Sequence, residues 1–524
     1  MDALFEVVLF LAIAILGAAL ARRLGVLSPI LLVVIGLVLS FVPGFPQVRL
    51  DPELVLTGIL PPLLYVAALE TSVPAFRYNL RSILLLAVGL VIFTAMVVGL
   101  VVYALLPGVP LAVCLALGAV VAPPDAVAAT AVARRIGLPR RVVTILEGES
   151  LINDATALVL LRVATAAAVG SAVGIGDVGT EILVSAGGGI VVGVVGIAVF
   201  GCLHRRVRDP ILDNALSLIT PFAVVLLAEA LHTSGIVAVV VTGLALGHRM
   251  PVLMSAASRL QMNAFWRLAK FLLEGLVFLL VGLQLREVVT GLDTPGPILV
   301  GVTAVVLATV FFTRFLWVFP ATYLARLVPS ARRRDPLPPS GFPIVISWAG
   351  MRGVVTLAAV LALPMTLADG MSYPRELFVW LAFAVIVASL VLQGATLPWL
   401  ARRLRLPPDD PVQDALSAAG VQQQAGRAAR EHLDRLADTA PPAVVERLRE
   451  LIDQRNNSAW ERLGGDEQET PSEAYGRLRQ EMIDVERQVF RSARDEGRIP
   501  EEVLVRAYRD LDLEESLLRR GSAG

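Results

Sequence analysis

The chain has 524 residues, of which 56% are hydrophobic and 17% are charged, and its basic and acidic residues balance to a formal net charge of zero at pH 7. This apolar composition excludes an ordinary water-soluble protein, and the neutral charge balance gives no indication of nucleic-acid binding. The two cysteines, Cys114 and Cys202, lie in apolar runs and show neither a disulfide framework nor a metal-ligand spacing.

Apolar stretches of membrane-spanning length fill the first ~400 residues, since a helix needs about 20 residues to cross the hydrocarbon of a bilayer. Residues Met1 to Leu20 lack a basic leader and a clear small-residue cleavage site, so we interpret them as the first span and not as a cleavable signal. The sequence thus predicts an all-α membrane protein with thirteen transmembrane helices, near 3–21, 26–42, 52–69, 82–106, 110–132, 142–168, 179–203, 212–230, 234–248, 264–285, 297–325, 342–364 and 376–401.

The arginines between these spans are distributed unequally. One set of loops contains most of them, including Arg22, Arg23, Arg140, Arg141 and the run at 332–334, whereas the opposite loops contain only Arg49, Arg286 and Arg375. Because loops rich in Lys and Arg stay in the cytoplasm, the N-terminus is predicted outside and the C-terminus inside a plasma (inner) membrane.

Thirteen spans divide into six, one and six, which predicts two inverted six-helix repeats. The fifth span of each repeat contains residues that break helices: Ala122-Pro123-Pro124-Asp125 in one and Ala349-Gly350-Met351-Arg352-Gly353 in the other. Crossed, broken helices of this kind indicate an ion or substrate site near the middle of the membrane.

The sixth span contains Gly148-Glu149-Ser150-Leu151-Ile152-Asn153-Asp154, and charged groups at this depth usually mark an ion or proton pathway. Ser150 and Asp154 share one helix face because residues four apart lie about 40° apart around the axis, and Asn153 flanks them. Their oxygens suit hard alkali cations. The prolines remove two N–H donors and leave backbone carbonyls unpaired. The Pro124 carbonyl is a candidate ligand in this unwound segment, and Asp125 either binds the cation or caps the second half-helix.

Glu149 lies about 140° from Asp154 and therefore needs a partner of its own. We predict that it forms a structural ion pair with Arg352, because a buried arginine without a carboxylate would be costly. Glu147 is a candidate for lining an access funnel, or is simply solvated. Three further charged residues lie in apolar segments. Glu70 is near a span end, where it either snorkels or meets Arg77 or Arg81, and Glu274 and Arg314 either pair or stabilise helix packing, with a direct role in transport as the less favoured alternative.

A carboxylate in a partly dehydrated cavity accepts either a proton or a cation, because desolvation disfavours the bare anion. If Asp154 crosses the membrane barrier only when occupied, exchange of Na⁺ for H⁺ follows. A K⁺/H⁺ exchanger and a channel are the competing interpretations. An intramembrane enzyme is disfavoured, because no serine–histidine dyad or metal-spaced histidine pair lies within the spans.

Residues 403–524 contain no membrane-length apolar run and show mixed charges with helical spacing. This pattern predicts a cytoplasmic helical tail whose partner is unknown. The tail is either solvated and without chemistry of its own, or it regulates transport or stabilises a dimer.

Taken together, these motifs resemble those of the monovalent cation:proton antiporters, in the sodium/proton exchanger branch. Gly148 to Asp154 is similar to the signature helix of that family, Ala122 to Val127 to its unwound helix, and Gly350 to Val355 to its arginine-bearing helix. Leu60-Pro61-Pro62-Leu63-Leu64-Tyr65 also fits, and the resemblance covers roughly residues 5–402.

The resemblance implies a homodimer in membrane lipid that needs no cofactor or nucleic acid. Each subunit would have a dimer part at about 1–72 and 212–290 and a mobile core part at about 80–170 and 296–402, with Na⁺ held at Asp154 and Asp125. The Asn153-Asp154 pair implies electroneutral exchange. The family often has threonine where this chain has Pro124, so the resemblance leaves selectivity among Na⁺, K⁺ and Li⁺ open.

Overall fold

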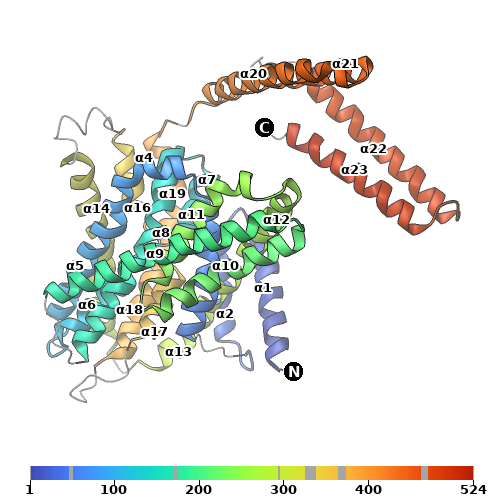
Figure 1. Cartoon of the computed structure of the whole chain (residues 1–524). Helices are drawn as coiled ribbons and strands as arrows, with labels where there is room; N and C mark the ends of the chain where they lie inside the picture. The colour runs from blue at the N-terminus through green and yellow to red at the C-terminus, as the bar shows by residue number, and fades with distance from the viewer. Residues whose placement is uncertain are drawn as a thin grey trace. The chain divides into compact units, whose positions relative to one another are not determined.

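Helices form the regular secondary structure of the residues that the computed structural model describes, which are 2–46, 51–169, 175–292, 295–324, 338–363, 373–407, 409–461 and 470–522. The chain divides into two units, Met1–Pro408 and Asp409–Gly524. Figure 1 shows the first unit as a bundle of closely packed helices and the second as the helices α20 to α23.

Helices of the first unit begin where the sequence provides start signals. Proline occupies the first turn of several of them, including α2, α4 and α10, where its missing N–H costs nothing. Asp209, Ser234 and Ser255 cap the N-termini of α10, α11 and α12 by accepting backbone N–H bonds. The elements in chain order are α1 (Asp2–Leu24), α2 (Ser28–Ser40), the π-helical η1 (Leu54–Ile59), α3 (Leu60–Glu70), α4 (Val73–Leu84), the π-helical η2 (Leu85–Leu90), α5 (Val91–Leu105), α6 (Leu111–Val121), α7 (Ala126–Arg135), α8 (Arg140–Ala168), α9 (Ile175–Arg206), α10 (Pro210–Ala230), α11 (Gly235–Leu253), α12 (Ala256–Leu283), α13 (Leu285–Thr290), α14 (Gly296–Tyr323), α16 (Gly341–Trp348), α17 (Val354–Leu361), α18 (Arg375–Ala388), the π-helical η4 (Ser389–Gln393) and α19 (Gly394–Leu404).

Nine helical stretches in the described part of the chain are long and apolar enough to cross a membrane: Leu4–Leu24, Val73–Leu105, Arg140–Ala168, Gly179–Arg206, Pro210–Ala230, Gly235–Leu253, Ala256–Thr290, Gly296–Tyr323 and Arg375–Leu404. The predicted spans at 26–42 and 52–69 fall on shorter apolar helices, and those at 110–132 and 342–364 are interrupted. The count of thirteen spans and the inverted repeat therefore stay predictions.

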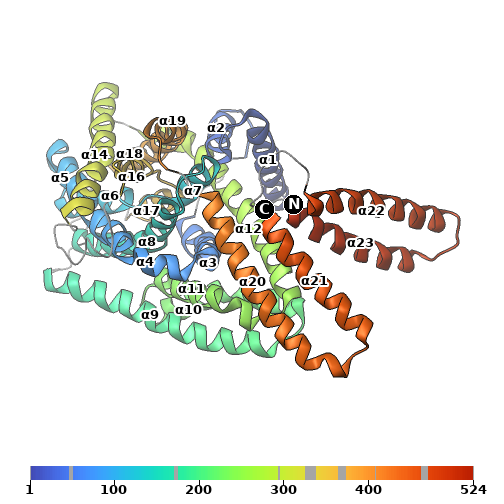
Figure 2. The ribbon, with the colours of Figure 1, turned by 90° about the horizontal axis from the view of Figure 1, so that it is seen from above.

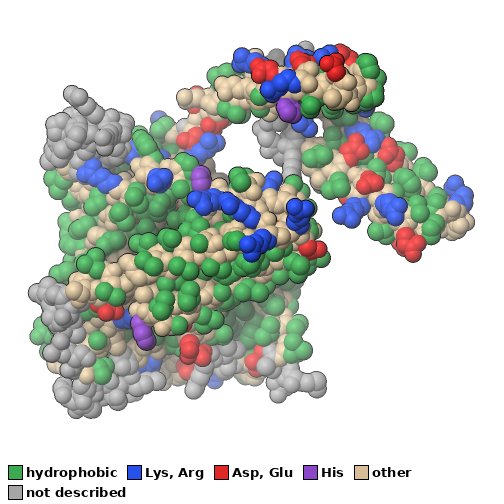
Figure 3. All heavy atoms as spheres, in the orientation of Figure 1, with side chains coloured by type: hydrophobic (Ala, Val, Ile, Leu, Met, Phe, Trp, Pro, Cys, Tyr) green, Lys and Arg blue, Asp and Glu red, His purple; other side chains and the backbone are tan. Residues whose placement is uncertain are grey.

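Large apolar side chains are exposed on the outer helices of the first unit, such as Leu226 on α10 and Phe312 and Leu316 on α14. In Figure 3 hydrophobic side chains extend over the visible side of this unit. Apolar exposure on this scale in a soluble protein would promote aggregation, whereas lipid accommodates it. The surface is that of a protein embedded in a membrane.

Helices α1, α2 and α12 pack against one another in the first unit. Figure 2 shows α1, α2 and α12 on one side, and α5, α6 and α14 on the other. The helices α2 and α12 touch backbone to backbone at Gly36 and Gly282. A Cβ atom on Gly36 would lie 2.4 Å from the Leu279 carbonyl oxygen, and one on Gly282 would lie 2.3 Å from that of Val33. Small residues at a crossing fix membrane helices closely together, so α12 is held firmly on α2.

The second unit consists of α20 (Pro411–Leu436), the short 3₁₀ turn η5 (Ala437–Thr439), α21 (Pro442–Glu461), α22 (Pro471–Asp495) and α23 (Glu501–Ser522). Thr470 and Glu473 form a capping box that starts α22. The helices α22 and α23 are joined by charged pairs, among them Arg479 with Glu514 and Arg487 with Glu515. Helical structure here agrees with the mixed-charge helical pattern of the sequence.

Candidate ion-binding site

Two interrupted helices meet inside the first unit. Helix α6 ends at Val121 and α7 begins at Ala126, while α16 ends at Trp348 and α17 begins at Val354. The prolines explain the first break, because they lack the N–H that would continue the helix. The backbone N–H of Asp125 donates to the Met351 carbonyl oxygen at 2.6 Å, so the two non-helical segments are in direct contact. Both predicted interruptions are confirmed.

Glycine allows the second break to approach the Asp125 carboxylate. A Cβ atom on Gly353 would lie 2.0 Å from Asp125 Oδ2 and 2.6 Å from its Cγ, which no real contact permits. The φ angle of Gly353 is −135°, a region open to all residues, so the glycine is needed for space and not for backbone freedom. Its missing side chain leaves room for the carboxylate of Asp125.

Helix α8 contributes Asn153 and Asp154 beside the first break. Asn153 is fully buried, and its Nδ2 donates to the Pro124 carbonyl oxygen at 2.6 Å. Its Oδ1 is shielded from solvent and has no hydrogen-bond partner among the residues that the structure describes. Asp154 is only 6% exposed. Asn153 thus uses a carbonyl of the non-helical segment between α6 and α7, which ties α8 to the break.

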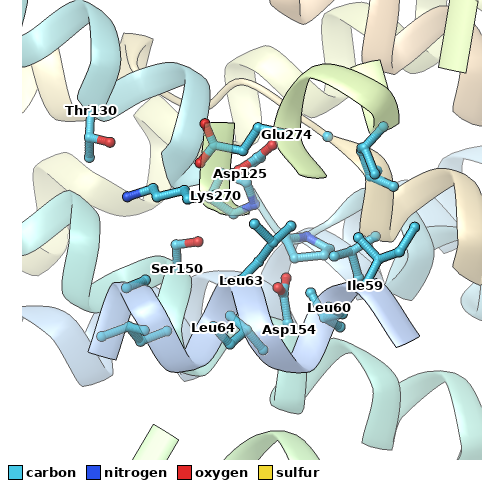
Figure 4. A pocket seen from close by; sticks show the side chains of 18 of the residues that line it. Ile59, Leu60, Leu63, Leu64, Asp125, Thr130, Ser150, Asp154, Lys270 and Glu274 are labelled. Atoms are coloured by element: carbon cyan, nitrogen blue, oxygen red, sulfur yellow. The ribbon is translucent and has the colours of Figure 1, made fainter. Parts of the chain in front are cut away.

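A cavity of about 230 Å³ lies against this assembly, and Ser150, Asp154, Asp125 and Pro124 all line it. Figure 4 shows Ser150, Asp154, Asp125 and Glu274 around the same space. Four of the five residues expected to hold a cation therefore share one cavity. The fifth, Asn153, lies behind it and reaches the Pro124 carbonyl instead.

The mouth of this cavity carries two ion pairs. Arg134 Nη2 lies 2.7 Å from Glu147 Oε1, and Lys270 Nζ lies 3.0 Å from Glu70 Oε2. These side chains are between 22% and 62% exposed, so the cavity opens at their end and closes at Asp154. Glu147, expected in a funnel or in solvent, lines the mouth and is paired with Arg134.

A second cavity, of about 740 Å³, approaches from the other end of α8. Its lining includes Ala155, Leu158 and Arg162 of α8 and Glu229 of α10. Glu147 and Arg162 are about 22 Å apart along α8 at 1.5 Å per residue. Asp154 lines the first cavity and its neighbour Ala155 lines the second, so the two spaces converge on one turn of α8.

The structure corrects the expected Glu149–Arg352 pair. Glu149 is paired with Arg314 of α14, whose Nη1 and Nη2 donate to Glu149 Oε1 and Oε2 at 2.6 and 2.7 Å. Arg314 Nε also donates to the Ile346 carbonyl oxygen at 2.9 Å. The sequence shows that a buried carboxylate needs a partner, but two arginines are available and only helix packing decides between them.

Arg352 instead supports the broken segments. Its guanidinium donates to the carbonyl oxygens of Val121 and Gly350, and its backbone N–H donates to Ser389 Oγ at 2.9 Å. The carbonyls of a broken helix lack their usual partners, and a buried arginine satisfies them. Arg352 is only 1% exposed and thus serves as an internal brace between α6 and the second break.

The sequence did not place three further residues at this site. The alternative that Glu274 pairs with Arg314 is wrong, because Arg314 pairs with Glu149. Glu274, Lys270 and Glu70 line the cavity, yet they come from α3 and α12, far along the chain from α8. A usable signal was present: Lys270 and Glu274 are two charged residues four apart in one apolar span, which places them on one helix face.

Comparison with known proteins gives a consistent result. Residues 9–403 match the family described as "Sodium/hydrogen exchanger, transmembrane". An uncharacterised Na⁺/H⁺ exchanger of Mycobacterium tuberculosis is 36% identical, with 98% of this chain and 95% of that protein covered. The Bacillus subtilis "Sodium, potassium, lithium and rubidium/H(+) antiporter" is 30% identical, with 93% of this chain and 74% of that protein covered.

A solved structure agrees on the fold. The sodium proton antiporter MjNhaP1 of Methanocaldococcus jannaschii superposes with a TM-score of 0.60 at 18% identity, covering 77% of this chain and 99% of that one. At this identity the likeness establishes the fold alone. With the family match over residues 9–403, it leads to one conclusion: the chain belongs to the sodium/hydrogen exchanger family of transmembrane proteins, which are cation/proton antiporters and not enzymes.

Proposed function

We propose that the protein is a secondary-active Na⁺/H⁺ antiporter in which Na⁺ and H⁺ compete for Asp154 in an electroneutral exchange. The observation that carries this proposal is the convergence of two cavities on Asp154 and Ala155. A carboxylate approached from both ends of a helix, and open to one end at a time, is what alternating access requires.

The ligands of the cation are oxygens in this proposal. Asp154 and Asp125 provide carboxylates, Ser150 a hydroxyl and Pro124 a backbone carbonyl, and all four residues line one cavity. Hard alkali cations prefer such oxygens. Asn153 positions Pro124 and adds no charge, so Asp154 is the group that changes between a bound proton and a bound cation.

The proposal includes a homodimer in the plasma membrane, with the N-terminus outside and the C-terminus in the cytoplasm. In this orientation the mouth at Arg134 and Glu147 faces the cytoplasm, because α8 starts in an arginine-rich loop at Arg140 and Arg141. The core would carry α8 and the two broken helices, and would move against α1 to α3 and α10 to α12.

A broader K⁺/H⁺ or Na⁺/K⁺/Li⁺ antiporter is the second candidate. The B. subtilis relative carries sodium, potassium, lithium and rubidium in its name, and Pro124 offers only a carbonyl at this position. Alkali cations all carry one positive charge, so selection among them depends on the number and arrangement of the ligands around the ion. The two candidates share the same site and differ in the ions that it accepts.

The deciding experiment uses proteoliposomes with an internal pH dye. Wild type should move protons in response to Na⁺ gradients, Asp154→Asn should not, and Glu181→Gln, an exposed site on α9, should match wild type. Exchange that persists in folded Asp154→Asn protein would refute the role of Asp154. Replacing Na⁺ by Li⁺ or K⁺ separates the two candidates, and the absence of current during exchange tests electroneutrality.

A further inference from the structure

Glu274 of α12 lines the candidate cation site, and α12 packs mainly against α2 and α1. Glu274 lines the same cavity as Asp125 and Asp154, and it interacts electrostatically with Asp125, Lys270 and Glu70. Figure 4 shows its side chain beside Asp125, on the wall across from the α8 residues. A third carboxylate is therefore directed at the space that the cation would occupy.

One oxygen of the half-buried Glu274 carboxylate has no hydrogen-bond partner among the described residues. This oxygen, Oε1, is shielded from solvent. The two cationic side chains that line the cavity are already engaged, Lys270 with Glu70 and Arg134 with Glu147. A buried polar atom without a partner is costly, and a bound water or ion is one way to satisfy it. A bound cation would remove the cost.

We propose that Glu274 is a further ligand for the transported cation, and that it acts only while the cavity opens at the Glu70–Lys270 end. The inference rests on the proposed function, because it takes Asp154 as the transport carboxylate. It adds that the affinity for the cation differs between the two faces of the membrane, and that Glu274 sets the affinity on the cytoplasmic face.

The dependence on conformation follows from where Glu274 is anchored. Helix α12 is held on α2 by the backbone contact at Gly36 and Gly282. Asp125 is tied instead to the second break by its bond to Met351, and Asp154 sits on α8 with them. If the group containing α8 moves relative to α12, Glu274 stays behind. A ligand that binds in one conformation alone raises affinity in that conformation only.

The test compares vesicles that present opposite faces. In everted membrane vesicles, Glu274→Gln should raise the apparent KM for Na⁺ about tenfold, which corresponds to about 1.4 kcal/mol, with the maximal rate retained. In right-side-out vesicles the KM for Na⁺ should stay within about twofold of wild type, because Glu274 does not bind the cation in that conformation. A twofold change in KM corresponds to less than about half a kcal/mol. Glu274→Asp keeps the negative charge on a shorter side chain, so in everted vesicles its affinity for Na⁺ should lie between that of Glu274→Gln and that of wild type.

Glu70→Gln is the matched control, because it removes the same charge from the lining of the same cavity at a side chain that is 46% exposed. Solvent screens that position, so its KM should rise less than that of Glu274→Gln. Three results for Glu274→Gln would each overturn the inference: an unchanged KM in everted vesicles, an equal rise of the KM on both faces, or a lost maximal rate with a normal KM. If Asp154→Asn is inactive while Glu274→Gln gives any of these results, the proposed function stands and only the inference about Glu274 fails. If Asp154→Asn is active, the proposed function and the inference both fail.

Discussion

Arg314 and Glu149 form a two-pronged ion pair in the interior of the first unit, with N–O distances of 2.6 and 2.7 Å and side chains that are 2% and 1% exposed. The guanidinium matches the carboxylate fork to fork, which fixes direction as well as distance. Glu149 precedes Asn153 by one helical turn on α8. The pair therefore attaches α14 to α8 immediately beside the candidate cation site.

Breaking this pair should destabilise the protein strongly. Glu149→Gln leaves the Arg314 guanidinium buried without its carboxylate, and a single change of this kind typically costs about 3–5 kcal/mol. We expect a clear fall in the thermal unfolding temperature of the detergent-solubilised protein, and a partial return of stability in the double variant Glu149→Gln/Arg314→Met, which removes both charges.

A double-mutant cycle with Arg352 provides the control. Arg352 donates to backbone carbonyls and interacts with Glu149 only through its charge, so the coupling of Glu149→Gln with Arg352→Met should be smaller than the coupling with Arg314→Met. If Glu149 instead coupled more strongly to Arg352 than to Arg314, the assignment of the pair would be wrong.

Gly353→Ala should weaken cation binding without unfolding the protein. The added Cβ would lie 2.0 Å from Asp125 Oδ2, so the carboxylate has to move away. Because φ is −135°, alanine brings no backbone strain, and the effect should appear in the KM for Na⁺. We expect an increase of about tenfold or more, which is about 1.4 kcal/mol of lost binding, measured in proteoliposomes.

Gly301→Ala on α14 is the comparison, since no atom lies within 4 Å of its added Cβ. Alanine favours a helix by up to about 1 kcal/mol over glycine, so this variant should be neutral or slightly stabilised. Equal KM values for Gly353→Ala and wild type would show that Asp125 does not contribute to the cation site.

Local chemistry made much of the site predictable from the sequence. The two helix breaks are predicted by Pro123 and Pro124, which lack a backbone N–H donor, and by the glycines around Arg352, which lack a side chain. The helical period places Ser150 and Asp154 on one face, and the structure lines one cavity with both. These inferences need only the covalent properties of a few neighbouring residues.

Partner choice between distant helices could not be predicted in the same way. Arg314 and Glu149 are 165 residues apart, and Lys270 and Glu70 are 200 apart. The sequence of one helix does not determine which other helix packs beside it. Arg352 and Arg314 carry the same charge at a similar predicted depth, so the sequence could not distinguish them as partners of Glu149. Glu274 could not be assigned to the cation site for the same reason, because only the packing of α12 across the cavity reveals what it faces.

The tail offers a prediction about pH. Arg479 Nε and Nη2 donate to Glu514 Oε1 and Oε2 at 2.6 and 2.7 Å, linking α22 to α23. These hydrogen bonds hold the pKa of the Glu514 carboxyl below its usual value. A group whose pKa is depressed by folding stabilises the folded state above its unfolded pKa, here about 4.3, and loses that contribution as the pH falls through the folded pKa. The contribution should thus be constant from pH 7 to about pH 5 and disappear at lower pH.

Hydrogen exchange of residues 501–522 in the full chain measures this contribution. Glu514→Gln should speed exchange at pH 7 relative to wild type, and the difference should shrink towards pH 3, once intrinsic exchange rates are corrected, because the wild-type carboxyl is then protonated as well. Glu502→Gln removes an exposed acid of the same helix and should follow wild type throughout. Identical protection of Glu514→Gln and wild type at pH 7 would mean that the pair does not hold α23 on α22, and that the buried Leu504 and Leu511 of α23 suffice to hold it there.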